Sequence, residues 1–217
     1  MPTPLAAPAL SLLAGALALS LTGCGSLFKQ PNPNKMTYLL PTMGSLTSGS
    51  GEVADRGGAT GVVTAVRPFR IASEYSDKSL TYRLGTVEME RDYYNAWLVS
   101  PDAMITERLR EWLAASGLVG QVQDSGSLVA ANYIIEGSII EFGGDYTNDA
   151  QLKAVVSIRL TLLPAARAES GGSLIHNTYR VEIPLKDRDP ATLVAGLGQG
   201  IAQVFNEFGA DMGKKLR

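Results

Sequence analysis

Two segments in the second half of the chain alternate apolar and polar side chains with a period of two. Residues 150–164 place an apolar side chain at every even position, and residues 173–185 place theirs mainly at odd positions. This period is that of a strand with one face in a core and the other in water. A third segment, 132–142, is apolar on both faces, as a central strand would be. Such strands, joined by short loops, predict a mainly antiparallel sheet with one polar face.

Residues 100–117 change from the strand period to a helical one. Ser100 is expected to cap the helix, Pro101 suits its first position, and Asp102 suits its positive end. Apolar residues then recur at helical spacing, and Gly117 is expected to end the helix.

Residues 187–212 carry a second helical stripe of apolar residues, with Asp189 as the expected N-cap and Pro190 as the first helical residue. The glycine-rich stretch GLGQG, residues 196–200, lies inside this stripe. A phosphate-binding loop would instead stand between a strand and the start of a helix. We therefore expect this helix to pack closely on the sheet or on a neighbouring subunit, which is compatible with a homo-oligomer.

Further strands are expected at 61–68, 79–85 and 86–92, where β-rich runs are bounded by Pro or Gly. The order of elements is then strands, helix, strands, helix. This order predicts the α+β class: a two-layer sandwich of a mainly antiparallel sheet with two helices packed on one face. The uncovered sheet face, or an edge strand, is where a partner can bind.

The single cysteine, Cys24, follows a charge-free apolar segment that ends in small residues. Such a segment is typical of a secretory signal, and its apolar core is at the short end of what spans a membrane. The sequence LTGC, residues 21–24, resembles the bacterial lipobox, in which the signal is cut before the cysteine. We expect residues 1–23 to be a signal peptide and Cys24 to carry a covalent lipid such as palmitate. More than one acyl chain gives durable anchoring.

Residues 24–60 are rich in Gly, Ser, Pro, Asn and Thr, which predicts a lipidated N-terminus followed by a flexible tether. A short strand is expected near 37–40, and the stretch before it reaches roughly 20 Å as a coil. Residues 61–217 are expected to form the globular domain. By resemblance to lipoprotein sorting signals, Gly25 and Ser26 lack the acidic residue that retains a lipoprotein in the inner membrane. The expected location is the periplasmic face of the outer membrane.

The composition argues against several classes of function. A formal net charge of −2 and a pI of about 5.5 give no basic field for nucleic acid. The only histidine, His176, lies on the polar side of an expected strand, and no His and Cys residues have the spacing of a metal site. Glu88 and Glu90 share a strand face, which leaves a carboxylate enzyme as a minor alternative. We expect no enzymatic activity, and no cofactor apart from the lipid on Cys24.

Three aromatic residues, Tyr93, Tyr94 and Trp97, stand just before the first helix. Aromatic side chains are favoured both in cores and in protein interfaces. A core position is the favoured interpretation for the group. Any member that is exposed is the first candidate for an anchoring contact.

A set of motifs follows the lipobox in a fixed order. These are VRPFRIASEYSDKSLTYR from Val66, the aromatic segment before Pro101, MITERLREWLAASGLVGQV from Met104, and ANYIIEGSIIEF from Ala131. In this combination the chain resembles the ABC-type transport auxiliary lipoproteins, which accompany Mce-type and paraquat-inducible-type lipid transport systems. The resemblance is strongest between Gly61 and Phe142, and it depends on a few residues: Arg67, Leu80, Tyr82, Arg83, Tyr93, Trp97 and Pro101.

The resemblance implies a noncatalytic lipoprotein at the outer membrane that docks or receives the periplasm-spanning part of the transporter. Its partners would be an Mce-domain protein and an ABC permease and ATPase, besides the membrane that holds its lipid anchor. The candidate partner-binding residues are Arg67, Tyr82, Arg83, Tyr93 and Trp97. An outer-membrane assembly lipoprotein that plugs or pilots a β-barrel remains the alternative.

Overall fold

The structure is a computed structural model in which the chain divides into two units, residues 1–34 and 35–217. All helices and strands below belong to the second unit, and only Asn34 of the first unit is described. The described residues are 34–42, 59–124, 126–166 and 172–216.

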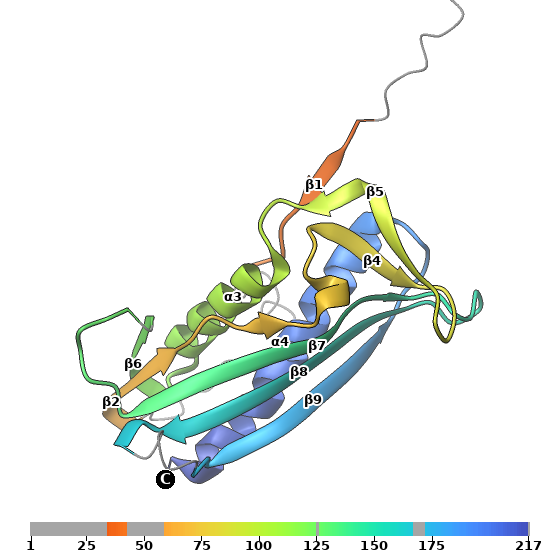
Figure 1. Ribbon diagram of the computed structural model, residues 1–217. Helices are drawn as coiled ribbons and strands as arrows, with labels where there is room; N and C mark the ends of the chain where they lie inside the picture. The colour runs from red at the N-terminus through yellow and green to blue at the C-terminus, as the bar shows by residue number, and fades with distance from the viewer. Residues whose placement is uncertain (1–33, 43–58, 125, 167–171, 217) are drawn as a thin grey trace, which may run out of the picture. The chain divides into compact units, whose positions relative to one another are not determined.

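Nine described strands form one sheet, in which the long strand β7 is the organising element (Figure 1). β8 pairs with β7 over nearly its whole length, and β9 continues the sheet beyond β8. The other edge of β7 pairs in succession with β2, β3 and β4. The strands are β1 (Met36–Tyr38), β2 (Ala59–Val66), β3 (Arg70–Ile71), β4 (Ser79–Arg83), β5 (Met89–Trp97), β6 (Val119–Asp124), β7 (Tyr133–Asp145), β8 (Lys153–Pro164) and β9 (Ile175–Pro184).

The sheet is mixed, so the prediction of a mainly antiparallel sheet was wrong in this respect. β7, β8 and β9 are antiparallel to one another, as are β4 and β5. In contrast, β2, β3 and β4 all run parallel to β7, and the β1–β5 and β2–β6 pairs are also parallel. The reason is that residues 59–83 follow β7 in one direction, interrupted by the short 3₁₀ helix η2 (Ser73–Tyr75). Parallel neighbours need long connections, and a short-loop argument from sequence does not foresee them.

The two helices begin and end close to where the sequence predicts. α3 spans Pro101–Ser116 and is followed by Gly117, whose φ of 66° is the left-handed conformation that suits glycine. α4 spans Pro190–Lys215, and the Asp189 carboxylate accepts a hydrogen bond from the Ala191 backbone N–H at 2.9 Å. Ser100 occupies the N-cap position of α3, but its side chain makes no capping hydrogen bond.

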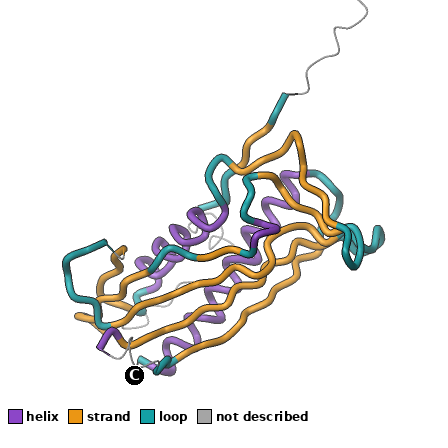
Figure 2. Tube along the Cα trace, viewed as in Figure 1, coloured by secondary structure: helices purple, strands orange, loops and turns teal. Residues whose placement is uncertain are grey.

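Both helices lie behind the sheet, which leaves its other face uncovered (Figures 1 and 2). α4 packs on β8 and β9, where a Cβ added to Gly200 would lie 2.8 Å from Val156 Cγ2. This close approach confirms that the helix packs tightly on the sheet. At the contact between the helices, the ring of Trp112 lies 6.1 Å from that of Phe205, and a Cβ on Gly209 would overlap Trp112. The helices and one sheet face therefore enclose a single core.

Candidate functional site

The uncovered sheet face, here called the open face, carries a ladder of charged side chains along β7, β8 and β9. Arg180 donates to Glu141 at 2.6 Å and also pairs with Glu182, which accepts from Lys153 at 2.7 Å. The hydrogen bonds to Glu141 and then Glu182 raise the pKa of Arg180. Those from Lys153 and then Arg180 lower the pKa of Glu182. Farther along, Arg67 pairs with Glu136. These hydrogen bonds favour the charged forms of Arg180 and Glu182 and join β7, β8 and β9 across the open face.

A small cleft of about 190 Å³ opens on this face near the far end of β7. The polar side chains that line it are Tyr75, Arg83, Glu141, Asp145 and Arg180. The Arg83 guanidinium donates to the Tyr75 hydroxyl at 3.5 Å and has no carboxylate partner in the described part of the chain. A guanidinium in this position can donate two parallel hydrogen bonds to one carboxylate. The cleft is thus a point at which a protein partner with a carboxylate can be held.

Arg67 and Arg83 both border the open face but lie at opposite ends of β7. The Arg67 backbone N–H donates to the Ile135 carbonyl oxygen at 3.0 Å, whereas Arg83 is in register with Asp145. The two arginines are therefore separate points on one surface and do not form one cluster.

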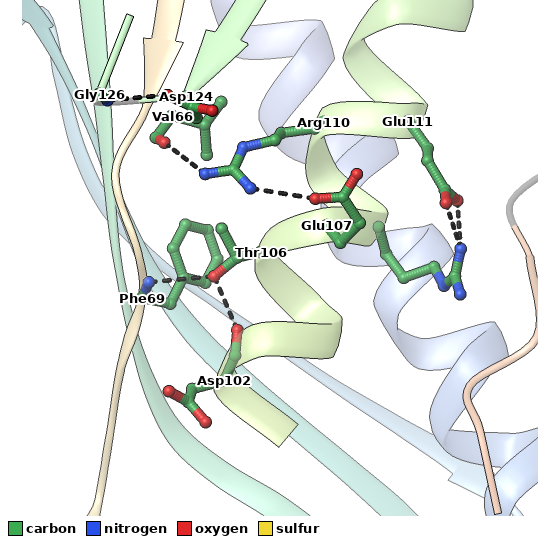
Figure 3. A network of polar contacts seen from close by, with 10 residues as sticks. Val66, Phe69, Asp102, Thr106, Glu107, Arg110, Glu111, Asp124 and Gly126 are labelled. Carbon is green, nitrogen blue, oxygen red and sulfur yellow. Dashed lines mark hydrogen bonds and ion pairs between the residues drawn. The ribbon is translucent and has the colours of Figure 1, made fainter. Parts of the chain in front are cut away.

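A larger cleft of about 610 Å³ lies between α3 and β6 (Figure 3). Arg110 reaches from α3 to donate to the Val66 carbonyl oxygen and to Glu107, each at 3.0 Å. Nearby, Thr106 Oγ1 accepts from the Phe69 backbone N–H at 3.0 Å. These polar groups join α3 to β2 and to the segment that follows it. We assign this cleft a structural role.

Two of the sequence-predicted partner-binding residues, Tyr82 and Trp97, lie in the core. The Tyr82 hydroxyl donates to Asp92 at 2.7 Å, and its ring stacks on that of Tyr146 at 5.1 Å. Burial, and then the hydrogen bond to Asp92, raises the pKa of Tyr82. Trp97 is 3% exposed and its ring lies 5.5 Å from that of Phe142. Both side chains position strands β4 and β5 and do not reach the surface.

Tyr93 differs from these two, because 71% of it is exposed. Its ring meets that of Tyr94 edge to face at 5.0 Å, and the Lys35 ammonium lies 4.2 Å above the Tyr93 ring. Other exposed apolar side chains lie on β1 and at the end of β5. We call this set the apolar rim: Met36, Leu39, Tyr93, Tyr94, Leu98 and Val99. Sequence reasoning singled out only the tyrosines, although YLLP and WLVS carry the remaining signal.

The groups considered for catalysis are scattered over the surface. His176 is exposed on β9 and its Nδ1 lies 3.0 Å from Thr161 Oγ1. Glu88 and Glu90 are exposed, and neither lines the clefts described above. Within the described ranges, no three His, Cys, Asp or Glu residues come together as a metal site would require.

Cys24 and the expected signal peptide, 1–23, lie outside the described residues. In the part of the chain that is described, no helix combines the length and apolar character needed to cross a membrane.

Comparison with known proteins gives a match to one family. Residues 45–208 match the family model of the ABC-type transport auxiliary lipoprotein component. Among curated proteins, none matches this sequence.

Several solved structures share the fold at low sequence identity. The crystal structure of protein XCC0632 from Xanthomonas campestris, of the family DUF330, is 18% identical, with a TM-score of 0.60 over 69% of this chain and 83% of that one. An uncharacterized protein is 17% identical, with a TM-score of 0.63 over 82% and 97%. The hypothetical protein CT253 from Chlamydia trachomatis is 14% identical, with a TM-score of 0.53 over 73% and 98%. At these identities the likeness concerns the fold alone.

Proposed function

Because the chain belongs to the ABC-type transport auxiliary lipoprotein family, we propose that it is a noncatalytic, lipid-anchored component of an Mce-linked lipid transport system. The observation that carries the proposal is the family match over residues 45–208. The chain docks or receives the periplasm-spanning Mce-domain protein, whose ABC permease and ATPase lie at the inner membrane. It needs no cofactor for this role.

The N-terminal part of the chain supplies the anchor. Residues 1–23 are the signal peptide, Cys24 carries the lipid, and the residues between Cys24 and β1 tether the docking domain, to which residues 35–217 belong. The family is one of lipoproteins, and Cys24 is the only cysteine that can be acylated. Because Gly25 and Ser26 follow it in place of an acidic residue, the anchor sits in the outer membrane and the domain faces the periplasm.

The open face is the docking surface for the Mce-domain protein. Two features support this assignment: the helices leave this face uncovered, and its charges are held by a rigid antiparallel ladder. Arg83, which lacks a carboxylate partner among the described residues, is the point at which an acidic side chain of the partner is bound. Arg67, which pairs with Glu136 farther along this face, is a secondary contact.

In-cell photocrosslinking of the full-length chain tests the surface. A photoreactive residue replaces Arg159, which is exposed on β8 in the open face, and the matched control replaces Gln203, which is exposed on α4. We expect an adduct with an Mce-domain protein from position 159 and none from position 203. The substitution Arg83→Ala should lower the yield of that adduct several-fold.

Two other results would redirect the proposal. An adduct with a β-barrel protein from position 159 supports the alternative of an outer-membrane assembly lipoprotein. The Cys24→Ala form tests the anchor separately, because it should leave the outer-membrane fraction. Unchanged fractionation would mean that Cys24 is not the anchor.

A further inference from the structure

The apolar rim is a second surface, distinct from the open face, for which neither the core nor the family match gives a use. It comprises two residues of the β1 segment and four from β5 and the turn after it. Leu98 is 53% exposed and Leu39 is 50% exposed. Contiguous exposed apolar groups on a soluble domain mark a contact with another apolar surface.

The pairing of β1 with β5 brings the two parts of the rim next to each other. Tyr38 is in register with Trp97, and the Leu98 backbone N–H donates to the Tyr38 carbonyl oxygen at 2.9 Å. The next residues along the two parallel strands, Leu39 and Leu98, therefore lie side by side. At the other end of the pair, Met36 is in register with Asn95, close to Tyr93 and Tyr94.

Two lysines flank the rim. The Lys35 ammonium lies on the ring of Tyr93 at 4.2 Å, and the Lys78 ammonium donates to the Leu98 carbonyl oxygen at 3.1 Å. Asp92, the acidic group of β5 nearest to these residues, is turned onto Tyr82 and Asn95. Tyrosines and aliphatic side chains with lysines at their border are the composition that proteins present to lipid headgroups.

The rim is close in sequence to Cys24, the proposed site of the lipid. Met36 is twelve residues after Cys24. A chain of that length spans at most about 40 Å even when fully extended. The rim therefore includes β1, the first strand among the described residues, and it stays within this distance of the Cys24 lipid. A weak apolar contact that is held at such short range gains from a high effective concentration of its target.

We propose that the apolar rim rests in the headgroup region of the bilayer that holds the Cys24 lipid, with Lys35 and Lys78 facing the phosphates. This inference depends on the lipid anchor of the proposed function. The rim orients the domain on the membrane, and the open face remains available to the periplasmic partner.

The single cysteine of the chain makes the test direct, because an introduced cysteine is the only free thiol once Cys24 is acylated. The full-length lipoprotein with Leu98→Cys is labelled with the fluorophore NBD and reconstituted into vesicles of phosphatidylethanolamine and phosphatidylglycerol. Leu128→Cys is the matched control, because Leu128 is fully exposed in the loop after β6, at the opposite edge of the sheet. We expect a blue shift and quenching by nitroxide-labelled lipids at position 98, and neither at position 128.

Each other result has a defined meaning. Emission at position 98 that stays as in water overturns the inference, and so does a blue shift that the nitroxide lipids do not quench, because a second copy or a protein partner then covers the rim. As a second variant, Leu39→Ser with Tyr93→Ser should return the position 98 label to aqueous emission while the protein stays on the vesicles. Intact mass and vesicle sedimentation report on the anchor separately. An unmodified Cys24 would contradict the lipid anchor of the proposed function, whereas a lipidated protein with aqueous emission at position 98 would contradict only the rim.

Discussion

The sheet has two regions that are built in different ways. β7, β8 and β9 form an antiparallel unit of consecutive long strands, covered by α4. The region from β1 to β6 is assembled from shorter strands, most of them parallel, and α3 packs on β6 and β3. Both regions use β7, which belongs to the antiparallel unit on one edge and receives β2, β3 and β4 on the other.

The two regions differ in how much apolar surface they expose. The antiparallel unit presents the charged ladder of the open face on strands whose other side is fully buried, such as Val156 and Ile158. The mixed region contains the short edge strand β1 and the apolar rim, where half of each leucine side chain meets solvent. Under the two proposals above, partner recognition and membrane contact use different parts of one sheet.

The largest expected effect tests whether the two regions unfold together. Trp97→Ala removes a buried ring that packs on Phe142 of β7, and such truncations cost about 3–5 kcal/mol. We expect one cooperative transition with its midpoint at a lower denaturant concentration. Circular dichroism and the fluorescence of Trp112 should report the same midpoint. Two separate transitions would show that the mixed region unfolds without the antiparallel unit.

A smaller effect is expected where the helices of the two regions meet. Gly209→Ala places a methyl group against Trp112, and overpacking of this kind should lower the free energy of unfolding by about 2 kcal/mol. Gly213→Ala in the same helix is the control, since its nearest neighbour would be Leu118 at 3.9 Å. That variant should gain up to about 1 kcal/mol from helix propensity. Equal stability of the two variants in chemical denaturation would argue against close packing at Gly209.

Tyr82→Phe tests a polar contact inside the mixed region. Burial opposes ionisation of Asp92, but hydrogen bonds from Tyr82, from Asn95 and from the Tyr94 amide outweigh it and lower the pKa of the carboxyl. A depressed carboxyl pKa stabilises the fold above the unfolded value of about 4, and this stability is lost as the pH falls through the folded pKa.

At neutral pH the free energy of unfolding of the variant should therefore be lower by about 1.5 kcal/mol, the low end of the range for a hydrogen bond to a charged group. The deficit should shrink as the pH falls below about 4. Urea denaturation at several pH values measures it, and a deficit that does not depend on pH would mean that the ionised Asp92 is not the acceptor that matters.

The smallest effect is expected on the ladder of the open face. Lys153→Ala removes one half-exposed ion pair with Glu182, and exposed pairs of this kind contribute about 0.2–1 kcal/mol. The change should diminish further at high salt. A double-mutant cycle with Glu182→Ala isolates the pair, and a coupling energy above this range would show that the ladder stabilises the fold as well as presenting a surface.

The antiparallel unit was largely predictable, because its information is local. In β8 the even-numbered residues from Ala154 to Leu162 are buried, as the period of two indicates. Asp189 and Pro190 likewise mark the start of α4 through local chemistry. The helix positions and the α+β class follow from such signals.

The mixed region was not predictable in the same way, because its pairing is non-local. The eight residues of β2 carry no local signal that pairs Thr64 with Tyr133, far along the chain, or that makes the two strands parallel. The site residues show the same limit. Trp97 and Tyr93 lie in one strand, yet Trp97 is buried against Phe142 of β7 whereas Tyr93 is exposed.

The short strand β1 also determines how the domain would respond to a pulling force on the lipid anchor proposed at Cys24. Three residues join β1 to β5, whereas β7 has thirteen residues in the sheet. Under tension we expect β1 to detach first and the antiparallel unit to stay folded. The longest separation between the lipid and the sheet would then grow from about 40 Å to about 120 Å, the extended length of the chain from Cys24 to Ala59. The domain would thus have a second, longer reach into the periplasm, at the cost of withdrawing Leu40 from the core while the antiparallel unit stays folded.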